Sequence, residues 1–162
     1  MVLYIGHKII SEKIYKDFYK QKFECSYWNN PTAVTLTLEP RNSANSILTD
    51  AVVRKEVRHL LNRLGRKYFG NKHKKKSFRR LVIWERGEKG LLHLHMAIER
   101  PTETSISDFE SYVMSVWISL EWGLRECRFT DVVNKGWLNY ILKNKSKDSL
   151  DWSVDLENSV AE

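Results

Sequence analysis

Two apolar runs joined by a short linker constrain the fold of this 162-residue chain more than any other feature. The runs are RRLVIWE, which ends at Glu85, and LLHLHMAIE, which ends at Glu99. In the linker RGEKG, Gly87 and Gly90 can adopt positive φ angles, so the pattern predicts a β-hairpin. An apolar hairpin face needs cover, and other elements of the chain must therefore pack on it.

Helical and extended patterns flank the hairpin on both sides. Apolar residues at helical spacing predict helices over residues 7–23, 46–70, 107–123 and 134–147. The first helix is expected to carry Ile10, Ile14 and Phe18 on one face, and the third to open with a capping box from Ser107 to Glu110. Alternating and β-branched runs predict strands over residues 32–40 and 124–133. This order of elements predicts an α+β domain with a central antiparallel sheet and flanking helices.

The length of the chain suits one domain, which we place at residues 1–147 with its core at residues 32–147. The remaining tail, residues 148–162, holds five acids and no base. This charge asymmetry motivates the hypothesis that the tail folds back on a basic surface and weakens unspecific binding. A chain that ends near Lys147 should then bind single strands more tightly.

The composition argues against several classes of protein. No run of eighteen apolar residues is present and the N-terminus is too polar for a signal peptide, so we expect a cytoplasmic protein without a membrane partner. Cys25 and Cys127 stand far apart without CxxC spacing. They are expected to be a reduced pair and neither zinc ligands nor nucleophiles.

Positive charge is concentrated in one part of a chain whose net charge is +7. The segment from Arg63 to Arg80, called the basic segment below, holds nine lysines and arginines and no acid. Such density favours contact with a nucleic-acid backbone over a merely solvated loop. The candidate DNA-binding residues are Arg66, Lys67, Lys72, Lys74, Lys75, Lys76, Arg79 and Arg80, with Lys147 in the last helix.

Two histidines stand on one face of the second hairpin strand. Residues two apart in a strand point the same way, so His93, His95 and Glu99 share a face. A three-residue loop from Glu88 to Gly90 would set Glu85 directly across from His93, whereas an odd register would send Glu85 to the other side.

Two imidazoles and a carboxylate can hold a divalent ion and leave positions open for water or substrate. Without a thiolate, this set suits Mg²⁺ or Mn²⁺. Ordinary half-buried strand histidines remain the alternative, because an HxH pair alone is common.

A second set of candidate residues lies in WLNYILKNK, from Trp137 to Lys145. On a helix Tyr140 and Lys143 are one turn apart on the same side, and Lys143 could favour the phenolate or neutralise a phosphate. Tyr140 could also be a core aromatic, although its neighbours already supply an apolar stripe. A tyrosine nucleophile, an open metal site and a basic surface together imply attack on a phosphodiester.

Three motifs in order resemble those of the HUH endonucleases, and specifically the rolling-circle replication initiators called Rep proteins. TLTLEP, residues 35–40, is similar to the first, hydrophobic Rep motif. HLHMAIE is similar to the second, with Glu85 eight residues ahead of His93, where viral Rep domains place a third metal ligand. YILK is similar to the third, YxxK, and the resemblance spans roughly residues 32–147.

The resemblance implies a sheet of about five antiparallel strands, of ferredoxin or RRM type, that nicks and joins single-stranded origin DNA with a hairpin. It implies that Tyr140 forms a 5′-phosphotyrosine link and frees a 3′-OH, while Glu85, His93 and His95 hold Mg²⁺ or Mn²⁺ and Lys143 assists. Asn144, one turn after the tyrosine, favours the single-tyrosine type. GRKYFGNKH lacks GK[ST], so no ATPase is expected and a host helicase and polymerase would be partners.

Three other functions compete with this interpretation. A single-tyrosine HUH transposase shares the histidine pair, but usually has Gln after the tyrosine and no equivalent of Glu85. A cupin would use Glu99 as its third ligand, but needs about eight strands. A non-catalytic RRM-type module would need exposed stacking aromatics, for which the hairpin supplies only Trp84.

Overall fold

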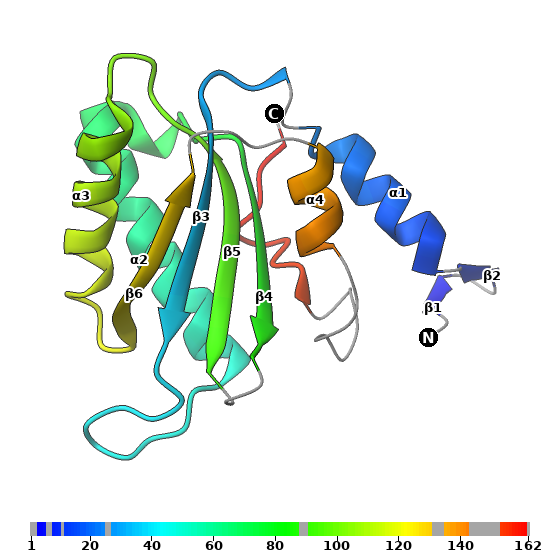
Figure 1. Cartoon of the computed structure of the whole chain (residues 1–162), viewed down its shortest axis with the longest axis horizontal. Helices are drawn as coiled ribbons and strands as arrows, with labels where there is room; N and C mark the ends of the chain where they lie inside the picture. Colours follow the sequence, from blue (N-terminus) through cyan, green and yellow to red (C-terminus); the bar gives the residue numbers. More distant parts are fainter. Residues whose placement is uncertain are drawn as a thin grey trace.

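The central sheet of the computed structural model contains four antiparallel strands in the order β4-β5-β3-β6 (Figure 1). The structure describes residues 3–5, 8–10, 12–24, 27–87, 91–130, 135–142 and 153–161. The strands of the sheet are β3 (Pro31–Leu38), β4 (Arg80–Arg86), β5 (Leu92–Glu99) and β6 (Gly123–Thr130). The α+β prediction is confirmed, because helices flank this sheet.

The resemblance implied about five strands, and in the described residues the sheet has four. The edge of β4 that faces away from β5 is met by two isolated bridges, Ile83 to Val154 and Arg80 to Val160, and not by a continuous strand. A separate two-stranded sheet, β1 (Leu3–Ile5) with β2 (Lys8–Ile10), stands before the first helix.

Four α-helices and one 3₁₀ helix are described around the sheet. They are α1 (Glu12–Lys22), α2 (Asp50–Phe69), η2 (Gly70–Lys74), α3 (Ile106–Trp117) and α4 (Lys135–Ile141). The predicted first helix began too early, since Lys8–Ile10 form β2. Its predicted apolar face was also wrong: Ile14 and Phe18 are exposed, whereas Tyr19 and Phe23 are buried.

The third helix begins two residues earlier than its predicted cap. Ser105 is the N-cap of α3, and its hydroxyl accepts a hydrogen bond from the backbone N–H of Asp108 at 3.0 Å. The same hydroxyl donates to the Asp108 carboxylate at 2.7 Å. Ser105 and Asp108 have the same three-residue spacing as the predicted pair Ser107–Glu110, so the spacing alone allowed either start.

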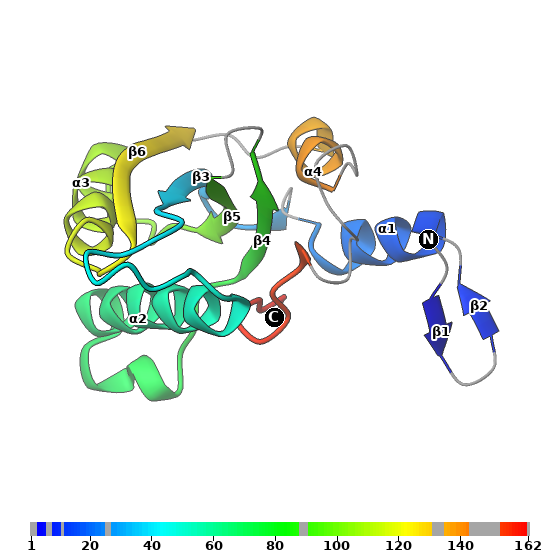
Figure 2. The same ribbon diagram turned by 90° about the horizontal axis from the view of Figure 1, so that it is seen from below.

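The two faces of the sheet are covered differently (Figure 2). One face packs against α2 and α3 in the larger core, which includes Leu36, Leu94 and Met96 of the sheet and Trp117 of α3. On the other face, Ala33, Leu81, Ile83 and Ala97 form a smaller core with side chains of α1 and α4 and with Val154. Figure 2 shows α2 and α4 on opposite sides of the sheet. Among the described residues, the smaller core lies at the end of the sheet where β3 and β4 begin and β5 ends.

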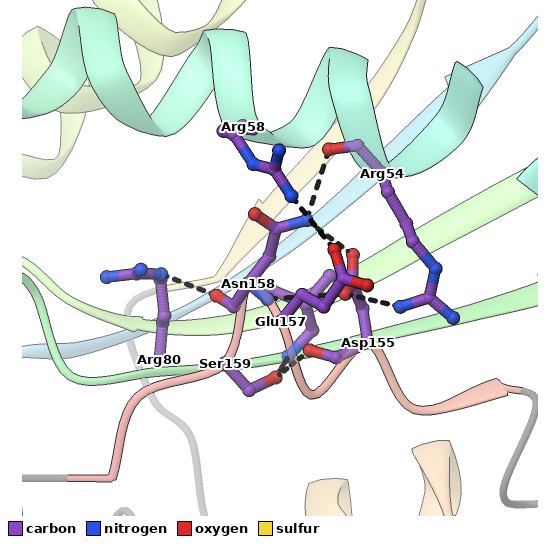
Figure 3. Close-up of polar contacts among 8 residues, drawn as sticks. Arg54, Arg58, Arg80, Asp155, Glu157, Asn158 and Ser159 are labelled. Atoms are coloured by element: carbon purple, nitrogen blue, oxygen red, sulfur yellow. Dashed lines mark hydrogen bonds and ion pairs between the residues drawn. The ribbon is translucent and has the colours of Figure 1, made fainter. Parts of the chain in front are cut away.

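Residues 153–161, called the C-terminal segment below, lie along the free edge of β4 (Figure 3). The N–H of Asp155 donates to the carbonyl of Val82 at 2.9 Å, and Arg80 and Val160 exchange two backbone hydrogen bonds. Asp155 is fully buried and pairs with Arg54 of α2 at 2.8 Å.

Asn158 completes this polar cluster: its side-chain amide donates to Asp155 at 2.7 Å and to the carbonyl of Arg54 at 3.1 Å. The tail was predicted to fold back on a basic surface. Among the described residues, its acids Asp155 and Glu157 contact Arg54 and Arg58 of α2, which precede the basic segment.

Candidate active site

A groove of about 800 Å³ opens over the other end of the second sheet face. Its floor is formed by the strands, and α4 borders it through Trp137 and Tyr140. The lining residues from the sheet are Thr35, Thr37, Glu85, His93, His95, Glu126, Cys127 and Arg128. The groove therefore brings together the predicted histidine pair, the predicted glutamate and the predicted tyrosine.

The hairpin register agrees with the register expected for a three-residue loop. Glu85 of β4 lies opposite His93 of β5, and Arg86 lies opposite Leu92. The N–H of Gly87 donates to the carbonyl of Leu91 at 2.8 Å and closes the hairpin, while residues 88–90 lie outside the described part. The even register puts Glu85 on the histidine face, as predicted.

His95 is held between both neighbouring strands. Its Nδ1 lies 3.1 Å from the hydroxyl of Thr35 on β3, and its Nε2 lies 3.1 Å from Oε1 of Glu85 on β4. His95 is 6% exposed, so these two contacts satisfy a nearly buried ring. Glu85 thus contacts the diagonal histidine, although His93 is its direct cross-strand neighbour.

His93 has the same contact on the side of β3. Its Nδ1 lies 3.2 Å from the hydroxyl of Thr37. A Cβ atom at Gly87 would lie 2.8 Å from the His93 Nε2, closer than side chains tolerate, so the ring reaches over this glycine. Gly87 is therefore required for the observed position of the His93 ring, whereas the positive φ angle that the sequence allowed is not adopted at this glycine.

Tyr140 approaches the histidines from α4. The Tyr140 and His95 rings meet edge to face with centroids 6.4 Å apart. Tyr140 is 51% exposed, whereas Leu138 and Ile141 of the same helix are buried against the sheet. The phenol is thus a groove residue and not a core aromatic. The predicted Lys143 and Lys147 both lie outside the described residues.

The chemistry of the donor set fits a divalent ion, because two imidazoles and a carboxylate occupy one face. Glu85 and His95 converge, but His93 Nε2 is directed at Gly87. Accordingly, no group of three His, Cys, Asp or Glu side chains in the described residues is arranged to hold a metal ion. Metal binding by all three would require the His93 ring to turn.

Cys127 also lines the groove, but its chemistry is different. Burial, assisted by the negative charge of Glu110, raises the pKa of the Cys127 thiol to about 11. At neutral pH the group is therefore a protonated thiol and a poor nucleophile. Cys25 lies outside the described residues.

The basic segment lies away from the groove. Arg66 and Lys67 belong to α2, and the lysines that follow belong to η2 or come directly after it. Since α2 covers the opposite sheet face, the structure does not bring these residues together with the histidines (Figure 2). Of the predicted DNA-binding residues in this segment, the exposed ones are Arg66, Lys67, Lys72, Lys74, Lys75 and Lys76.

Two arginines of the basic segment have internal partners. Arg79 lies 3.9 Å from Glu99. Arg80 donates to the carbonyls of Asn158 and Phe78 and to the hydroxyl of Ser77. Burial lowers the pKa of the Arg80 guanidinium to about 10, although nearby Asp155 opposes this shift. Through the carbonyl of Asn158, Arg80 also joins the polar cluster around Asp155 and Asn158, called the C-terminal cluster below.

Sequence reasoning missed several residues of the groove. Thr35 and Thr37 were seen only as part of a hydrophobic motif, although their spacing of two already placed them on one strand face. Glu126 and Arg128 of β6 follow the same spacing, and Thr35 lies opposite Arg128. Which of the two β6 faces meets the histidines depends on long-range pairing with β3, and no local signal gives it.

The structure also bears on the competing interpretations. Trp84 is only 7% exposed and has the Arg54 guanidinium 4.6 Å from its ring, so it is not available for stacking on bases. Glu99, the third ligand of a cupin-like site, accepts a hydrogen bond from the N–H of Asn29 at 2.9 Å. It is Glu85 that contacts His95.

None of the described helices is both long and apolar enough to span a membrane.

Comparisons with known proteins place the chain in a family. Searches of curated proteins and of solved structures gave no match. Residues 31–149, more than half of the chain, match the family model described as Replication-associated protein ORF2. The chain therefore belongs to this family of replication-associated proteins, a family of replication initiators.

Proposed function

We propose that this replication initiator is a site-specific endonuclease of the HUH, single-tyrosine type, which nicks and rejoins single-stranded origin DNA. The observation that carries the proposal is the meeting of Tyr140, His95 and Glu85 in one groove. These side chains come from α4, β5 and β4, and packing of a core alone does not require an exposed phenol beside a histidine–carboxylate pair. Family membership supports a role in replication with DNA as partner.

In the proposed reaction the Tyr140 hydroxyl oxygen attacks the scissile phosphorus from the groove. A bond forms between this oxygen and phosphorus while the bond from phosphorus to the 3′ oxygen breaks. The phenol loses its proton to solvent and the leaving 3′ oxygen takes one up, which gives a 5′-phosphotyrosine and a free 3′-OH. The reverse attack by a 3′-OH rejoins the strand.

Glu85, His93 and His95 would hold Mg²⁺ or Mn²⁺, which would supply positive charge to the non-bridging phosphate oxygens. Arg128, exposed at the groove on β6, is the described cation best placed to bind the phosphate backbone on the way in. From the sequence motif, Lys143 would neutralise the same phosphate or position the tyrosine.

Incubation with a random pool of single-stranded DNA and Mn²⁺, followed by a denaturing gel, tests this proposal. We expect a slowly migrating protein–DNA adduct that Tyr140→Phe removes by at least about 1,000-fold, since no other group replaces the nucleophile. Tyr27→Phe is the matched control, because Tyr27 is an 81% exposed tyrosine that does not line the groove.

Each possible outcome of this assay has a distinct meaning. An adduct that persists in Tyr140→Phe would rule out the tyrosine mechanism. Sequencing the DNA trapped by the wild type would give the nick site. If an oligonucleotide that carries the replication origin binds tightly but neither wild type nor control forms an adduct with it, the chain is a binding module and not a nuclease.

A further inference from the structure

The TLTLEP motif places two hydroxyls on the inner side of the histidine pair. Thr35 and Thr37 of β3 lie directly opposite His95 and His93 of β5. Each hydroxyl lies within hydrogen-bond distance of the Nδ1 atom of its own histidine, at 3.1 Å and 3.2 Å. The arrangement is thus repeated twice along one antiparallel strand pair.

These contacts determine which ring nitrogen faces the rest of the site. With Nδ1 turned toward β3, the Nε2 atoms of both rings point toward β4. His95 Nε2 meets Glu85 at 3.1 Å, and His93 Nε2 lies over Gly87. A flip of either imidazole would exchange a ring carbon for Nδ1 at the threonine and lose that hydrogen bond.

We propose that Thr35 and Thr37 are positioning residues, which keep Nδ1 of the two imidazoles at β3 so that Nε2 of each is left on the side where a divalent ion would bind. His93 would still have to move away from Gly87 to share that ion with Glu85 and His95. The role of the ion rests on the proposed function, whereas the hydroxyl–imidazole pairing does not. The threonines therefore contribute to the site in a motif whose other positions, such as the buried Leu36 and Leu38, serve the core.

A hydroxyl suits this position better than a carboxylate or a carbonyl oxygen, because it both donates and accepts. If His95 carries its proton on Nε2, that nitrogen donates to Glu85 and the Thr35 hydroxyl donates to the bare Nδ1. If Nε2 instead held a cation, Nδ1 would carry the proton and the same hydroxyl would accept it. The hydroxyl therefore suits either state of the ring.

The strand pair is itself anchored beneath the threonines. The carbonyl of Thr37 accepts a hydrogen bond from Trp117 Nε1 of α3 at 3.1 Å, and Thr37 is 2% exposed. The backbone that carries the Thr37 hydroxyl is therefore held by a buried contact with α3. Such support limits the movement of the ring that it contacts.

Binding of Mn²⁺ alone, measured by calorimetry on the full chain, tests the role of the hydroxyls. Thr35→Val and Thr37→Val keep the β-branched shape but lack the hydroxyl, and we expect each to raise the Kd for Mn²⁺ roughly 10–100-fold. Thr35→Ser and Thr37→Ser restore the hydroxyl and should bind within about threefold of wild type. Thr130→Val, an exposed strand threonine on β6, is the control and should have no effect.

The ¹⁵N chemical shifts of the histidine side chains in metal-free protein provide a second readout that does not depend on activity or on the ion. We expect Thr35→Val to shift the Nδ1 signal of His95 and leave that of His93, with the converse for Thr37→Val and no shift for the serine variants. Unchanged Nδ1 signals in both valine variants would overturn the proposal, as would wild-type Mn²⁺ affinity in both.

The two readouts separate this proposal from the proposed function. If wild type does not bind Mn²⁺ at all, the metal-dependent nuclease fails, while the pairwise shifts still decide whether the threonines position the rings. If Mn²⁺ binds but Tyr140→Phe retains the DNA adduct, the tyrosine mechanism fails and the role of the threonines stands.

Discussion

Strand β4 belongs to two polar clusters that differ in their access to solvent. At its start, Arg80 and Val82 join the C-terminal cluster around the fully buried Asp155, in which donors and acceptors pair within the fold. At its end, Glu85 joins the groove cluster with His93 and His95, which opens into a volume of about 800 Å³. Only a few residues of one strand separate the two environments.

Similar polar groups thus have different roles at the two ends of β4, according to what surrounds them. A buried and fully paired cluster costs desolvation that its hydrogen bonds must offset, and it makes the fold dependent on every member. A cluster beside a groove can exchange one of its contacts for a ligand. Loss of a C-terminal cluster residue should therefore reduce stability, and loss of a groove residue should reduce function.

The largest effect is expected for Asp155→Ala. It leaves Arg54 without its carboxylate partner and removes two acceptors from Asn158, so we expect a loss of about 3 kcal/mol and a fall in Tm of roughly 6–12 °C. Thermal unfolding gives the value. Glu157→Ala is the control: its pair with Arg58 is more than half exposed on both sides and is worth about 0–1 kcal/mol.

Glu85→Gln should show the opposite behaviour. The variant keeps the shape of the side chain but loses its charge beside His95, so we expect Mn²⁺ affinity and adduct yield to fall by about 100-fold. Unfolding free energy should change by less than about 1 kcal/mol. Glu126→Gln, which changes an exposed acid of the same groove, should leave both nearly unchanged, and equal losses in the two variants would contradict a special role for Glu85.

A smaller, local effect is expected for Gly87→Ala. The added methyl group would lie 2.8 Å from His93 Nε2, and the ring can escape because it is the end of a flexible side chain. We expect a shifted His93 signal in the ¹⁵N spectrum, because the ring must leave the position that it holds over Gly87. Gly70→Ala meets no atom within 4 Å but is strained at φ +53°, so it should lower stability by about 1–3 kcal/mol and leave His93 unchanged.

The smallest effect concerns a group that is buried without a full set of partners. Oε2 of Glu56 on α2 has no hydrogen-bond partner among the described residues. Burial raises the pKa of this carboxyl, Glu121 adds to the rise, and His59 and Lys55 oppose it. The folded state therefore binds a proton more readily than the unfolded state. Stability is lost as the pH rises from the unfolded value of 4.5 to the raised pKa, and the loss is complete above it.

Glu56→Gln should for this reason raise the unfolding free energy at pH 7 by about 1 kcal/mol. The gain should shrink as the pH is lowered toward the unfolded value of 4.5, where the wild-type carboxyl is protonated in the folded state. The Tm values of both proteins between pH 4 and pH 7 show whether the stability gain of the variant shrinks as the pH falls. A gain that does not depend on pH would mean that the charge is not the cause.

Local patterns in the sequence were sufficient for the hairpin but left its register open. The alternation of LLHLHMAIE gave the histidine face, whereas Glu85 was expected opposite His93 only if the loop had three residues, which is the register observed. The helix that carries Tyr140 was likewise predicted, from the helical spacing of its apolar residues. Local patterns failed where two signals were equivalent: both Ser105 and Ser107 have an acidic residue three positions later, and Ser105 is the N-cap of α3.

Contacts between distant segments could not be predicted from the sequence. The pairing of Asp155 with Arg54 joins residues about a hundred positions apart, and neither neighbourhood carries a signal of it. The contact of Glu85 with His95 depends on side-chain rotamers beyond the register. The basic segment lies on the side of the sheet opposite the groove because α2 packs on the face of the larger core. Amphipathic spacing predicts the helix but not the sheet face on which it packs.

The bridges from Val154 and Val160 to β4 have a further consequence for the behaviour of the protein in solution. They occupy backbone groups at a sheet edge that would otherwise be a template for strands of other molecules. A chain shortened before residue 153 would expose this edge together with Leu81 and Ile83, which are fully buried in the intact chain. Such a truncation should self-associate by strand pairing, and any gain in its DNA binding would have to be measured on monomer.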